Sequence, residues 1–334
     1  MQKIGLIRGR VLSVRGREFT LARGAKLFRS DDEGQTWYHW HTLPVGVVHR
    51  VAMAVPILAR LFRLGVHHLV YVDNKAVVVA NKESFLIDSG NVVSMGPLKG
   101  SRPMILCGSQ NECFYGEYRS NPERSEVAIY RLDFHNATWR TAWKFNGVRH
   151  VHGVFYDDYT NSFWVTTGDS DEESAIWRTD DQFSSLKRVV GGNQQFRAVQ
   201  LLFTEDYVYF GSDAPNELNH IYRMKKNGST VEKLASVGGS VFYGFKTSRY
   251  LFFSTAVEPS DVNSSRNSQV WFSKTGGTWK IACSFKKDSL SMKYFQYGQV
   301  FFPTLYGNDI EKLLCSPFAT KGHGKTFVMD ECSE

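Results

Sequence analysis

The segment Ser30 to Trp37, with the sequence SDDEGQTW, constrains the fold of this chain more than any other stretch. Short Ser and Asp side chains bond back to the backbone of a tight turn, and glycine adopts the positive φ that such turns require. The tryptophan can cover the hairpin that the turn closes. These eight residues therefore predict a β-hairpin turn. They point to a fold rather than a reaction, and we expect none of them to be catalytic.

A short β-branched or aromatic strand followed by a polar turn recurs along the chain. Clear copies lie at 27–30, 129–132, 176–179, 221–224 and 270–273. The steps after the second copy are 47, 45 and 49 residues, and the first step of 102 residues leaves room for a diverged copy. That copy fits at 76–87, and a last one is expected at 313–316.

Seven copies of about 48 residues account for nearly the whole chain, and a propeller blade usually needs about 40–50 residues. Four to eight blades, as a rule, close a ring. The sequence therefore predicts an all-β, seven-bladed β-propeller that occupies 1–334 as a single domain. Six blades are the alternative, because the second copy is weak.

Weaker versions of the first turn follow other copies of the repeat. The segment 273–279 is one residue short of the pattern, and 133–139 and 179–183 keep only fragments of it. With these turns the whole chain resembles the sialidase-like Asp-box propellers, in which the box is a turn on the outer edge of a blade. The part from Gly116 to Asp213 also resembles uncharacterised bacterial and archaeal BNR-repeat proteins.

Composition excludes several classes of function. The net charge is +7, but the basic residues are dispersed and form no stripe, so we expect no nucleic-acid partner. The sequence has no phosphate loop, no dinucleotide fingerprint and no metal-spaced cysteine pair, so we expect no cofactor and no metal. The charged N-terminus is unlike a signal peptide, and no apolar run reaches membrane-spanning length. These features favour a soluble, cytoplasmic protein, and they do not indicate an oligomeric state.

The apolar segment Val51 to Leu64 contains two arginines and stands apart from the repeats. A short helix lying on a membrane surface would have this composition. Pro56 interrupts the segment, however, so we expect a buried connection between blades, followed by an inner strand. Membrane contact is therefore not expected.

Polar residues concentrate in two kinds of blade loop. In a propeller, loops that join strands 2 and 3 share a face with loops that lead from strand 4 to the next blade. Scaffold loops of this kind often carry function. We expect seven candidate catalytic residues from these loops to converge in a polar cup near the axis: Glu117, His150, His152, Asp169, Arg197, Asp213 and Tyr243.

Structural roles would also account for several of these residues. Asp169 and Asp213 follow Gly and Ser at expected strand ends, which is ordinary turn chemistry. The pair His150 and His152 would suit a metal, but spacing reveals no third ligand. Arg197 would also serve as a clamp between blades, and Tyr243 as a packing residue.

The Asp-box resemblance implies a carbohydrate-active or carbohydrate-binding propeller. Sialidase activity itself is not expected, since the chain lacks the Arg-Ile-Pro motif and an assignable arginine triad. Hydrolysis needs two carboxyl groups, for which Glu117, Asp169 and Asp213 are the candidates. Glu117 is the expected general acid, because neighbouring Tyr115 and Tyr118 would desolvate it and raise its pKa.

Two other roles remain open. Elimination from a uronic acid polysaccharide needs a cation for the carboxylate and a base for the adjacent proton. Arg197 would supply the cation, His150 or His152 the base, and Tyr243 the acid. Alternatively, the propeller binds a glycan or a protein without reacting. The expected partner is a glycan or polysaccharide, with an anionic one favoured.

Overall fold

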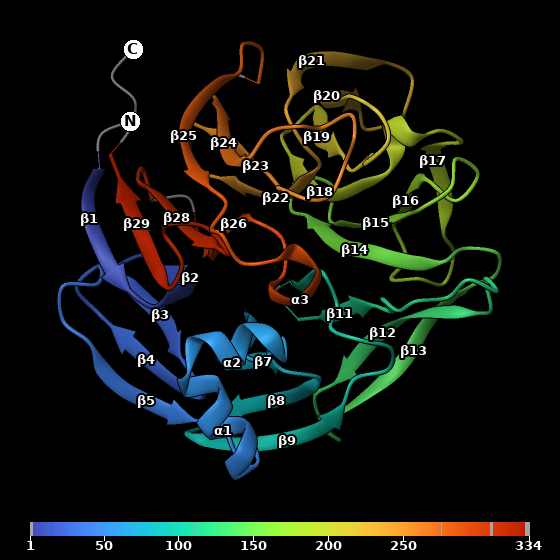
Figure 1. Ribbon diagram of the computed structural model, residues 1–334. Coiled ribbons are helices and arrows are strands. Elements are labelled where there is room, and N and C mark those ends of the chain that lie inside the picture. The colour runs from blue at the N-terminus through green and yellow to red at the C-terminus, as the bar shows by residue number, and fades with distance from the viewer. Residues whose placement is uncertain (1–2, 110, 275, 308–309, 331–334) are drawn as a thin grey trace. The chain divides into compact units, whose positions relative to one another are not determined.

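The computed structural model describes residues 3–109, 111–274, 276–307 and 310–330. Thr275, within the expected turn at 273–279, and Asn308 and Asp309 lie outside the described residues. Over the described ranges the strands form seven sheets of four strands, one of them with a fifth strand added (Figure 1). The protein is thus a seven-bladed β-propeller, and the alternative of six blades is wrong.

The chain divides into two compact units, which we describe separately. Unit 1 comprises Met1–Val66 and Leu234–Glu334, and unit 2 comprises His67–Lys233. The division falls within the first strand of one blade and the last strand of another. The prediction of one domain over 1–334 stays a prediction.

Unit 2 contains four blades, each a meander of four antiparallel strands. The strands in chain order are β6 (Val66–Val72), β7 (Lys75–Ala80), β8 (Glu83–Asp88), β9 (Asn91–Pro97), β10 (Leu106–Gly108), β11 (Cys113–Gly116), β12 (Val127–Asp133), β13 (Thr138–Phe145), β14 (His150–Asp157), β15 (Ser162–Gly168), β16 (Ala175–Thr179), β17 (Lys187–Gly191), β18 (Ala198–Phe203), β19 (Tyr207–Ser212), β20 (Asn219–Lys225) and β21 (Val231–Val237). A short 3-10 helix, η1 (Gln194–Phe196), precedes β18.

Unit 1 contains the other three blades. Its elements are β1 (Lys3–Arg8), β2 (Arg10–Arg15), β3 (Glu18–Arg23), β4 (Lys26–Ser30), β5 (Tyr38–Thr42), α1 (Val47–Ala54), α2 (Pro56–Leu61), β22 (Val241–Lys246), β23 (Leu251–Thr255), β24 (Asn267–Ser273), β25 (Lys280–Lys286), α3 (Met292–Phe295), β26 (Gln299–Phe301), β27 (Thr304–Tyr306), β28 (Leu313–Phe318) and β29 (Lys325–Met329). One blade has the order β1-β29-β28-β26, so the N-terminal strand completes a blade whose other strands come from the C-terminal end.

Six of the seven expected repeat copies lie in or include the third strand of a blade, and the last copy does not. The segment 313–316 falls in β28, which is the second strand of its blade, while β29 takes the third position. The sequence led us to expect the third strand of the blade at 313–316, where the second strand lies. The fourth strand of this blade is β1, so the C-terminal end of the chain supplies only the first three strands.

Strand burial follows position within a blade. Every residue of β15 is buried, whereas Phe145 is the only buried residue of β13 at the edge of its blade. An inner strand is covered on both faces, and an outer strand exposes one face to water. A blade is therefore more buried in its middle strands than at its outer edge.

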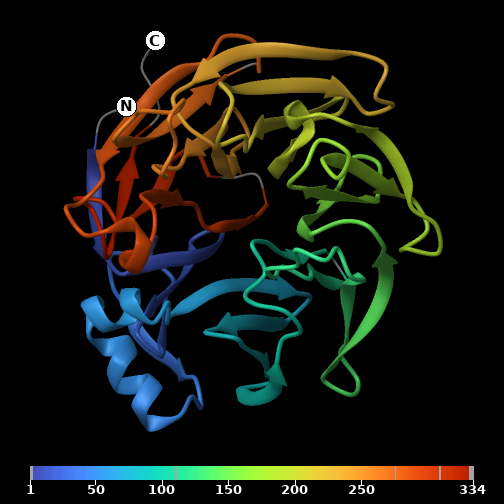
Figure 2. The same cartoon turned by 45° about the vertical axis from the view of Figure 1, so that its right-hand side comes forward.

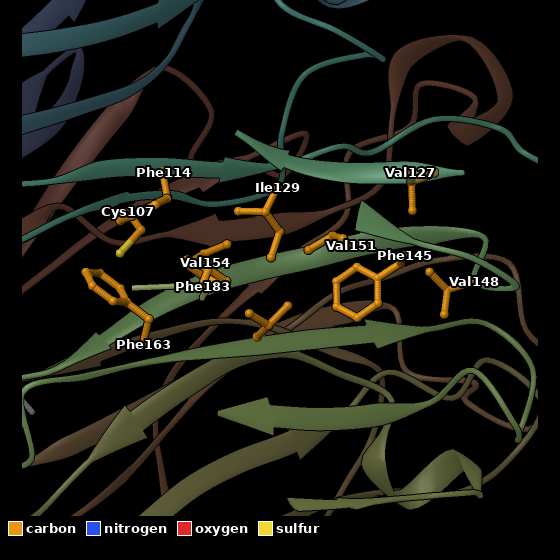
Figure 3. Close-up of a cluster of buried hydrophobic side chains, with 11 residues drawn as sticks. Cys107, Phe114, Val127, Ile129, Phe145, Val148, Val151, Val154, Phe163 and Phe183 are labelled. Carbon is orange, nitrogen blue, oxygen red and sulfur yellow. The ribbon is translucent and has the colours of Figure 1, made fainter. Parts of the chain in front are cut away.

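Packing between two blades of unit 2 positions the loops that carry the candidate site. Figure 3 shows Phe114, Ile129, Val151 and Phe163 meeting in one buried cluster between the blades β10–β13 and β14–β17. The approach is so close that a Cβ added to Gly116 would lie 2.2 Å from Cγ1 of Val151. Glycine is thus required where the end of β11 meets the start of β14.

The turn from Ser30 to Trp37 makes the predicted contacts. The hydroxyl of Ser30 donates to Asp32 at 2.7 Å, Thr36 donates its backbone N–H to Asp32 at 2.9 Å, and Gly34 has a φ of 86°. The indole N–H of the tryptophan donates to the carbonyl of Gly34 at 2.9 Å. This turn joins β4 and β5, as the sequence predicted.

The turn from Thr179 to Ser185 repeats this geometry with fewer matching residues. Thr179 donates to Asp181 at 2.8 Å, and Ser185 donates its backbone N–H to Asp181 at 2.9 Å. Phe183 has a φ of 73° at the place of the glycine, and its side chain joins the cluster of Figure 3. The fragment of the pattern at 179–183 is therefore a complete turn in structure.

The segment Val51 to Leu64 is not the buried connection that the sequence predicted. It belongs to the helices α1 and α2, in which only Ala52, Met53 and Arg60 are buried. Pro56 occupies the first turn of α2, where a proline has no hydrogen bond to lose. The inner strand predicted after this segment is present as β6. Over the part of the chain that the structure describes, neither these helices nor any other is long and apolar enough to cross a membrane.

Candidate functional site

Six of the seven predicted site residues lie at strand ends of unit 2. Glu117 follows β11, His150 and His152 belong to the start of β14, Asp169 follows β15, Arg197 precedes β18, and Asp213 follows β19. Five of them, all except Glu117, meet in one cluster through direct side-chain contacts. Within this unit, the loops between strands 2 and 3 therefore do lie beside the segments that enter strand 1.

Tyr243 lies in β22 of unit 1, where its ring packs against Phe301 with the ring centroids 4.7 Å apart. Phe301 is thus the partner of Tyr243 in the packing role that the sequence suggested. Its expected role as an acid stays a prediction.

Asp169 is the centre of the cluster. Its Oδ1 lies 3.0 Å from Nη2 of Arg197 and 3.4 Å from Nε2 of His150, and its Oδ2 lies 2.8 Å from Nη1 of Arg149. Burial alone would raise the pKa of Asp169, but the hydrogen bond from His150 and the charge of Arg197 outweigh it and hold that pKa below its usual range. The carboxylate is therefore charged at neutral pH.

Arg197 joins the two aspartates of the site. Its Nε lies 3.4 Å from Oδ2 of Asp213, while its Nη2 contacts Asp169. Both carboxylates thus contact one guanidinium group. These contacts are the ones expected of Arg197 as a clamp between blades. Arg149 also belongs to the site, although the sequence did not single it out. Its position next to His150 was the available signal.

The two imidazoles face each other. Nδ1 of His152 donates to the carbonyl of Ala198 at 3.0 Å, and Nδ1 of His150 donates to the carbonyl of Arg119 at 3.3 Å. Because a carbonyl only accepts, each Nε2 carries a lone pair unless its ring is doubly protonated. The two Nε2 atoms are 3.1 Å apart, so a proton or a cation must lie between them.

A proton fits this position better than a metal ion. One ligand atom each from His150, His152 and Asp169 lies within 4.8 Å of the others, which supplies the third ligand that spacing did not reveal. Arg149 and Arg197 already contact the carboxylate, however, and two positive charges oppose a divalent cation there.

His152 is the neutral ring of the pair. Burial, with the charge of His150 as a further cause, lowers the pKa of His152 to about 3. Nε2 of His150 lies beside both this neutral ring and the carboxylate of Asp169. The face of the His150 ring is covered by Tyr118, with the ring centroids 4.3 Å apart.

Glu117 does not join the other carboxylates. Its Oε1 accepts from Nε of Arg119 at 2.9 Å, and its Oε2 accepts from the backbone of Ala128 at 3.2 Å and from Tyr130 at 3.3 Å. Both carboxylate oxygens of Glu117 are thus occupied by partners within the fold, so Glu117 is poorly placed to be the expected general acid.

The reason given for that role also fails. Tyr115 stacks on Tyr130 with the ring centroids 5.0 Å apart, while the ring of Tyr118 packs at a tilt against His150. The two tyrosines beside Glu117 in sequence are thus directed to other partners.

A polar recess of about 280 Å³ opens next to the cluster. Its lining includes Asp171, Asn193, Gln194, Gln195, His220 and Lys233. Gln194 ties the recess to the cluster, because its Nε2 donates to the carbonyl of Asp169 and to the carboxylate of Asp171, both at 2.9 Å. Gln194 thus joins the lining of the recess, which also includes Glu217, to the loop that carries Asp169.

The sequence interpretation passed over this recess. From the polar loops it selected only charged and aromatic groups. Three consecutive amide side chains at the entrance to a strand were the signal, because amides both donate and accept hydrogen bonds.

Comparison with known proteins identifies the fold alone. No protein-family model and no curated protein matches the chain. An oligogalacturonate lyase in complex with manganese aligns with a TM-score of 0.61 at 10% identity, over 98% of this chain and 91% of that chain. YCF48 bound to D1 peptide aligns with a TM-score of 0.59 at 11% identity, over 99% and 96%. The GH74 enzyme of Niastella koreensis aligns with a TM-score of 0.54 at 13% identity, over 82% and 46%.

Proposed function

We propose that the protein binds an acidic glycan at the loop ends of unit 2. The observation that carries the proposal is the junction of two features: a recess lined by amides, and a cluster with two arginines. Gln194 contacts both. Amides bind sugar hydroxyls as donors and acceptors, and arginine is suited to carboxylates.

Arg149 is the group of the cluster that suits an anionic ligand. The cluster holds two arginines, Arg149 and Arg197, against the carboxylates of Asp169 and Asp213. The side chain of Arg149 is 36% exposed, which makes it the most accessible of these four groups. A glycan carboxylate would therefore meet Arg149 first.

Cleavage by β-elimination is the second candidate, and the imidazole pair favours it. In this reaction a base removes the proton next to the carboxylate, a carbon–carbon double bond forms, and the glycosidic carbon–oxygen bond breaks as an acid protonates the leaving oxygen. His152 is a neutral base, and its Nε2 lies 3.1 Å from Nε2 of His150. Both rings are buried, with 2% and 5% of their surfaces exposed, and this burial favours binding without reaction.

Hydrolysis, the other enzymatic alternative, suits the site less well. It needs a protonated carboxylic acid beside a second carboxylate. Glu117 is paired with Arg119, and Asp169 and Asp213 share Arg197. Each candidate carboxylate thus already contacts an arginine, and the pKa of Asp169 is held below its usual range.

A glycan array of matched acidic and neutral oligosaccharides tests the proposal, followed by titration of the best ligand and analysis of its products. We expect acidic glycans to bind. Arg149→Met and Gln194→Leu should each weaken binding by about tenfold, the equivalent of about 1.4 kcal/mol. Lys144→Met, which removes an exposed ion pair with Glu126 on the outer strand β13, is the matched control and should bind like the parent protein.

The products distinguish the candidates. Unsaturated uronate ends, detected by ultraviolet absorbance, would identify the lyase, and unchanged glycan would identify a binder. Cleavage products with saturated non-reducing ends would identify a hydrolase, and would contradict the assignment of the carboxylates to ion pairs with arginine. Equal binding of acidic and neutral glycans would contradict the proposal itself.

A further inference from the structure

The helices α1 and α2 expose an unusual amount of apolar surface. Among the described residues, sixteen large hydrophobic side chains are exposed, and seven of them lie between positions 47 and 62. These seven, named the apolar face from here on, are Val47, Val48, Val51, Val55, Ile57, Leu61 and Phe62. Val48 is 81% exposed and Phe62 is 61% exposed. Soluble surfaces scatter such residues singly, whereas a gathered patch marks an interaction site.

The opposite side of this helical pair is anchored in unit 1. Met53 of α1 is buried, and so is the side chain of Arg60 of α2. The guanidinium of Arg60 donates to Asp288 at 2.5 Å and to the carbonyl of Phe295 at 2.7 Å. Gln296 in turn donates to the backbone carbonyl of Arg60 at 3.1 Å. The helices are therefore held in place, and the apolar face does not belong to a loose segment. Figure 2 shows the helical pair as the blue coils at lower left.

The surroundings of the apolar face are basic. No Asp or Glu occurs between positions 34 and 72. Arg50 and Arg63, one near each end of the helical pair, are exposed. Next to α2 lies α3, which carries Lys293 and the exposed Tyr294, followed by the exposed Tyr297. Aromatic and basic residues around an apolar surface are typical of proteins at a membrane–water interface.

We propose that the apolar face docks on the surface of an anionic lipid bilayer. α1 has eight residues and α2 has six, so at 1.5 Å per residue they are about 12 Å and 9 Å long. A membrane core is about 30 Å thick, so these helices lie in the interface and do not cross it. The apolar side chains enter the acyl boundary, while Arg50, Arg63 and Lys293 contact lipid phosphates. This proposal revises the expectation that the protein makes no membrane contact.

A second copy of the chain fits the same face less well. A symmetric dimer would place the surface of each copy against the same surface of the other. Arg50 and Arg63 would then face basic groups, and the segment 34–72 holds no carboxylate to pair with them. Like charges brought together across an interface oppose association. An anionic bilayer meets both the apolar and the basic parts of the surface.

Co-sedimentation with vesicles tests the proposal. The full chain is mixed with vesicles of phosphatidylcholine alone, and with vesicles that also contain phosphatidylserine. We expect binding to the mixed vesicles that weakens as salt is raised. The double variant Val48→Ser/Phe62→Ser should lower the partition coefficient by at least about tenfold. Ile281→Ser is the control, because Ile281 is 47% exposed on β25, outside the apolar face.

Two further measurements separate lipid binding from misfolding and from self-association. Arg50→Gln/Arg63→Gln should remove most of the preference for phosphatidylserine, and thermal unfolding of each variant should match the parent protein. Failure of the parent protein to bind either vesicle would overturn the proposal, as would equal binding by the double variant. A dimer in sedimentation velocity that the double variant abolishes would assign the apolar face to a second copy. None of these outcomes depends on glycan binding.

Discussion

The polar cluster of unit 2 and the apolar face of unit 1 differ in whether their side chains have partners within the fold. In the cluster, charged groups are withdrawn from water, and each finds its partner inside the fold: Asp169 has two arginines and Arg197 has two carboxylates. In the apolar face, hydrophobic side chains are exposed to water, and packing within the fold does not account for their exposure. We therefore expect substitutions in the cluster to lower stability, and substitutions in the apolar face to leave stability unchanged and to affect a partner.

Removal of Arg197 should produce the largest effect. Arg197→Met leaves Asp169 and Asp213 without their shared cation, and breaking a buried ion pair usually costs about 3 to 5 kcal/mol. Chemical denaturation measures this loss. Lys144→Met is the control, since its ion pair with Glu126 is exposed and such pairs contribute about 0 to 1 kcal/mol. Equal effects of the two substitutions would remove the distinction between the regions.

A methyl group added to Gly116 should have the next largest effect. Its Cβ would collide with Val151, and overpacking of this kind costs about 1 to 3 kcal/mol. Gly46→Ala, at the start of α1, is the matched substitution, because nothing lies within 4 Å of its added Cβ. We expect a change within about 0.5 kcal/mol there. If Gly116→Ala left the free energy of unfolding unchanged, the blades β10–β13 and β14–β17 would not be closely packed at this position.

Acidification should weaken the cluster through His152. The unfolded chain protonates this side chain near its ordinary pKa of 6.5, whereas the folded chain holds its pKa at about 3. Between these values the unfolded state binds more protons, so stability is full above pH 6.5 and is lost as the pH falls toward 3. Each pH unit in this window costs at most about 1.4 kcal/mol.

His152→Gln isolates this contribution, because glutamine cannot take up the proton. Its stability should fall less steeply with acid than that of the parent protein, when both are measured by denaturation from pH 7 to pH 4. The exposed His135→Gln is the control. Parallel profiles for the His152 variant and the parent would show that this imidazole is not held neutral.

The smallest change in stability is expected at the apolar face. Val48→Ser/Phe62→Ser removes two side chains that are already largely in water, so the free energy of unfolding should change by no more than about 0.5 kcal/mol. Differential scanning calorimetry measures this. If the free energy of unfolding fell by several kcal/mol, the apolar face would pack within the fold. Its substitutions would then lower stability as those in the polar cluster do.

The propeller could be predicted from the sequence because each repeat is a local pattern. An apolar strand and a polar turn lie close together in the chain, and so do their contacts, as Ser30 and Asp32 illustrate. The prediction failed at the copy 313–316, because β1 joins that blade from the other end of the chain. It failed also at Val51 to Leu64, because an apolar run in a sequence is expected to be buried by default.

The candidate site was predicted in composition but not in contacts. His150 pairs with Gly168 across the strands β14 and β15, and this register places Asp169 beside the imidazole. Spacing along the chain does not contain that register. Glu117 was wrongly expected to join the cluster, because its ion-pair partner Arg119 is only two residues away. A sequence does not show whether two such neighbouring charged residues pair with each other or face a ligand.

Calorimetric titration with two oligosaccharides of equal length, one made of uronic acids and one of the corresponding neutral sugars, tests the central claim most directly. The acidic ligand should bind about tenfold or more tightly than the neutral one, and Arg149→Met should remove the difference. Equal affinities, or a preference that survives in Arg149→Met, would contradict an anionic-glycan site on these loops.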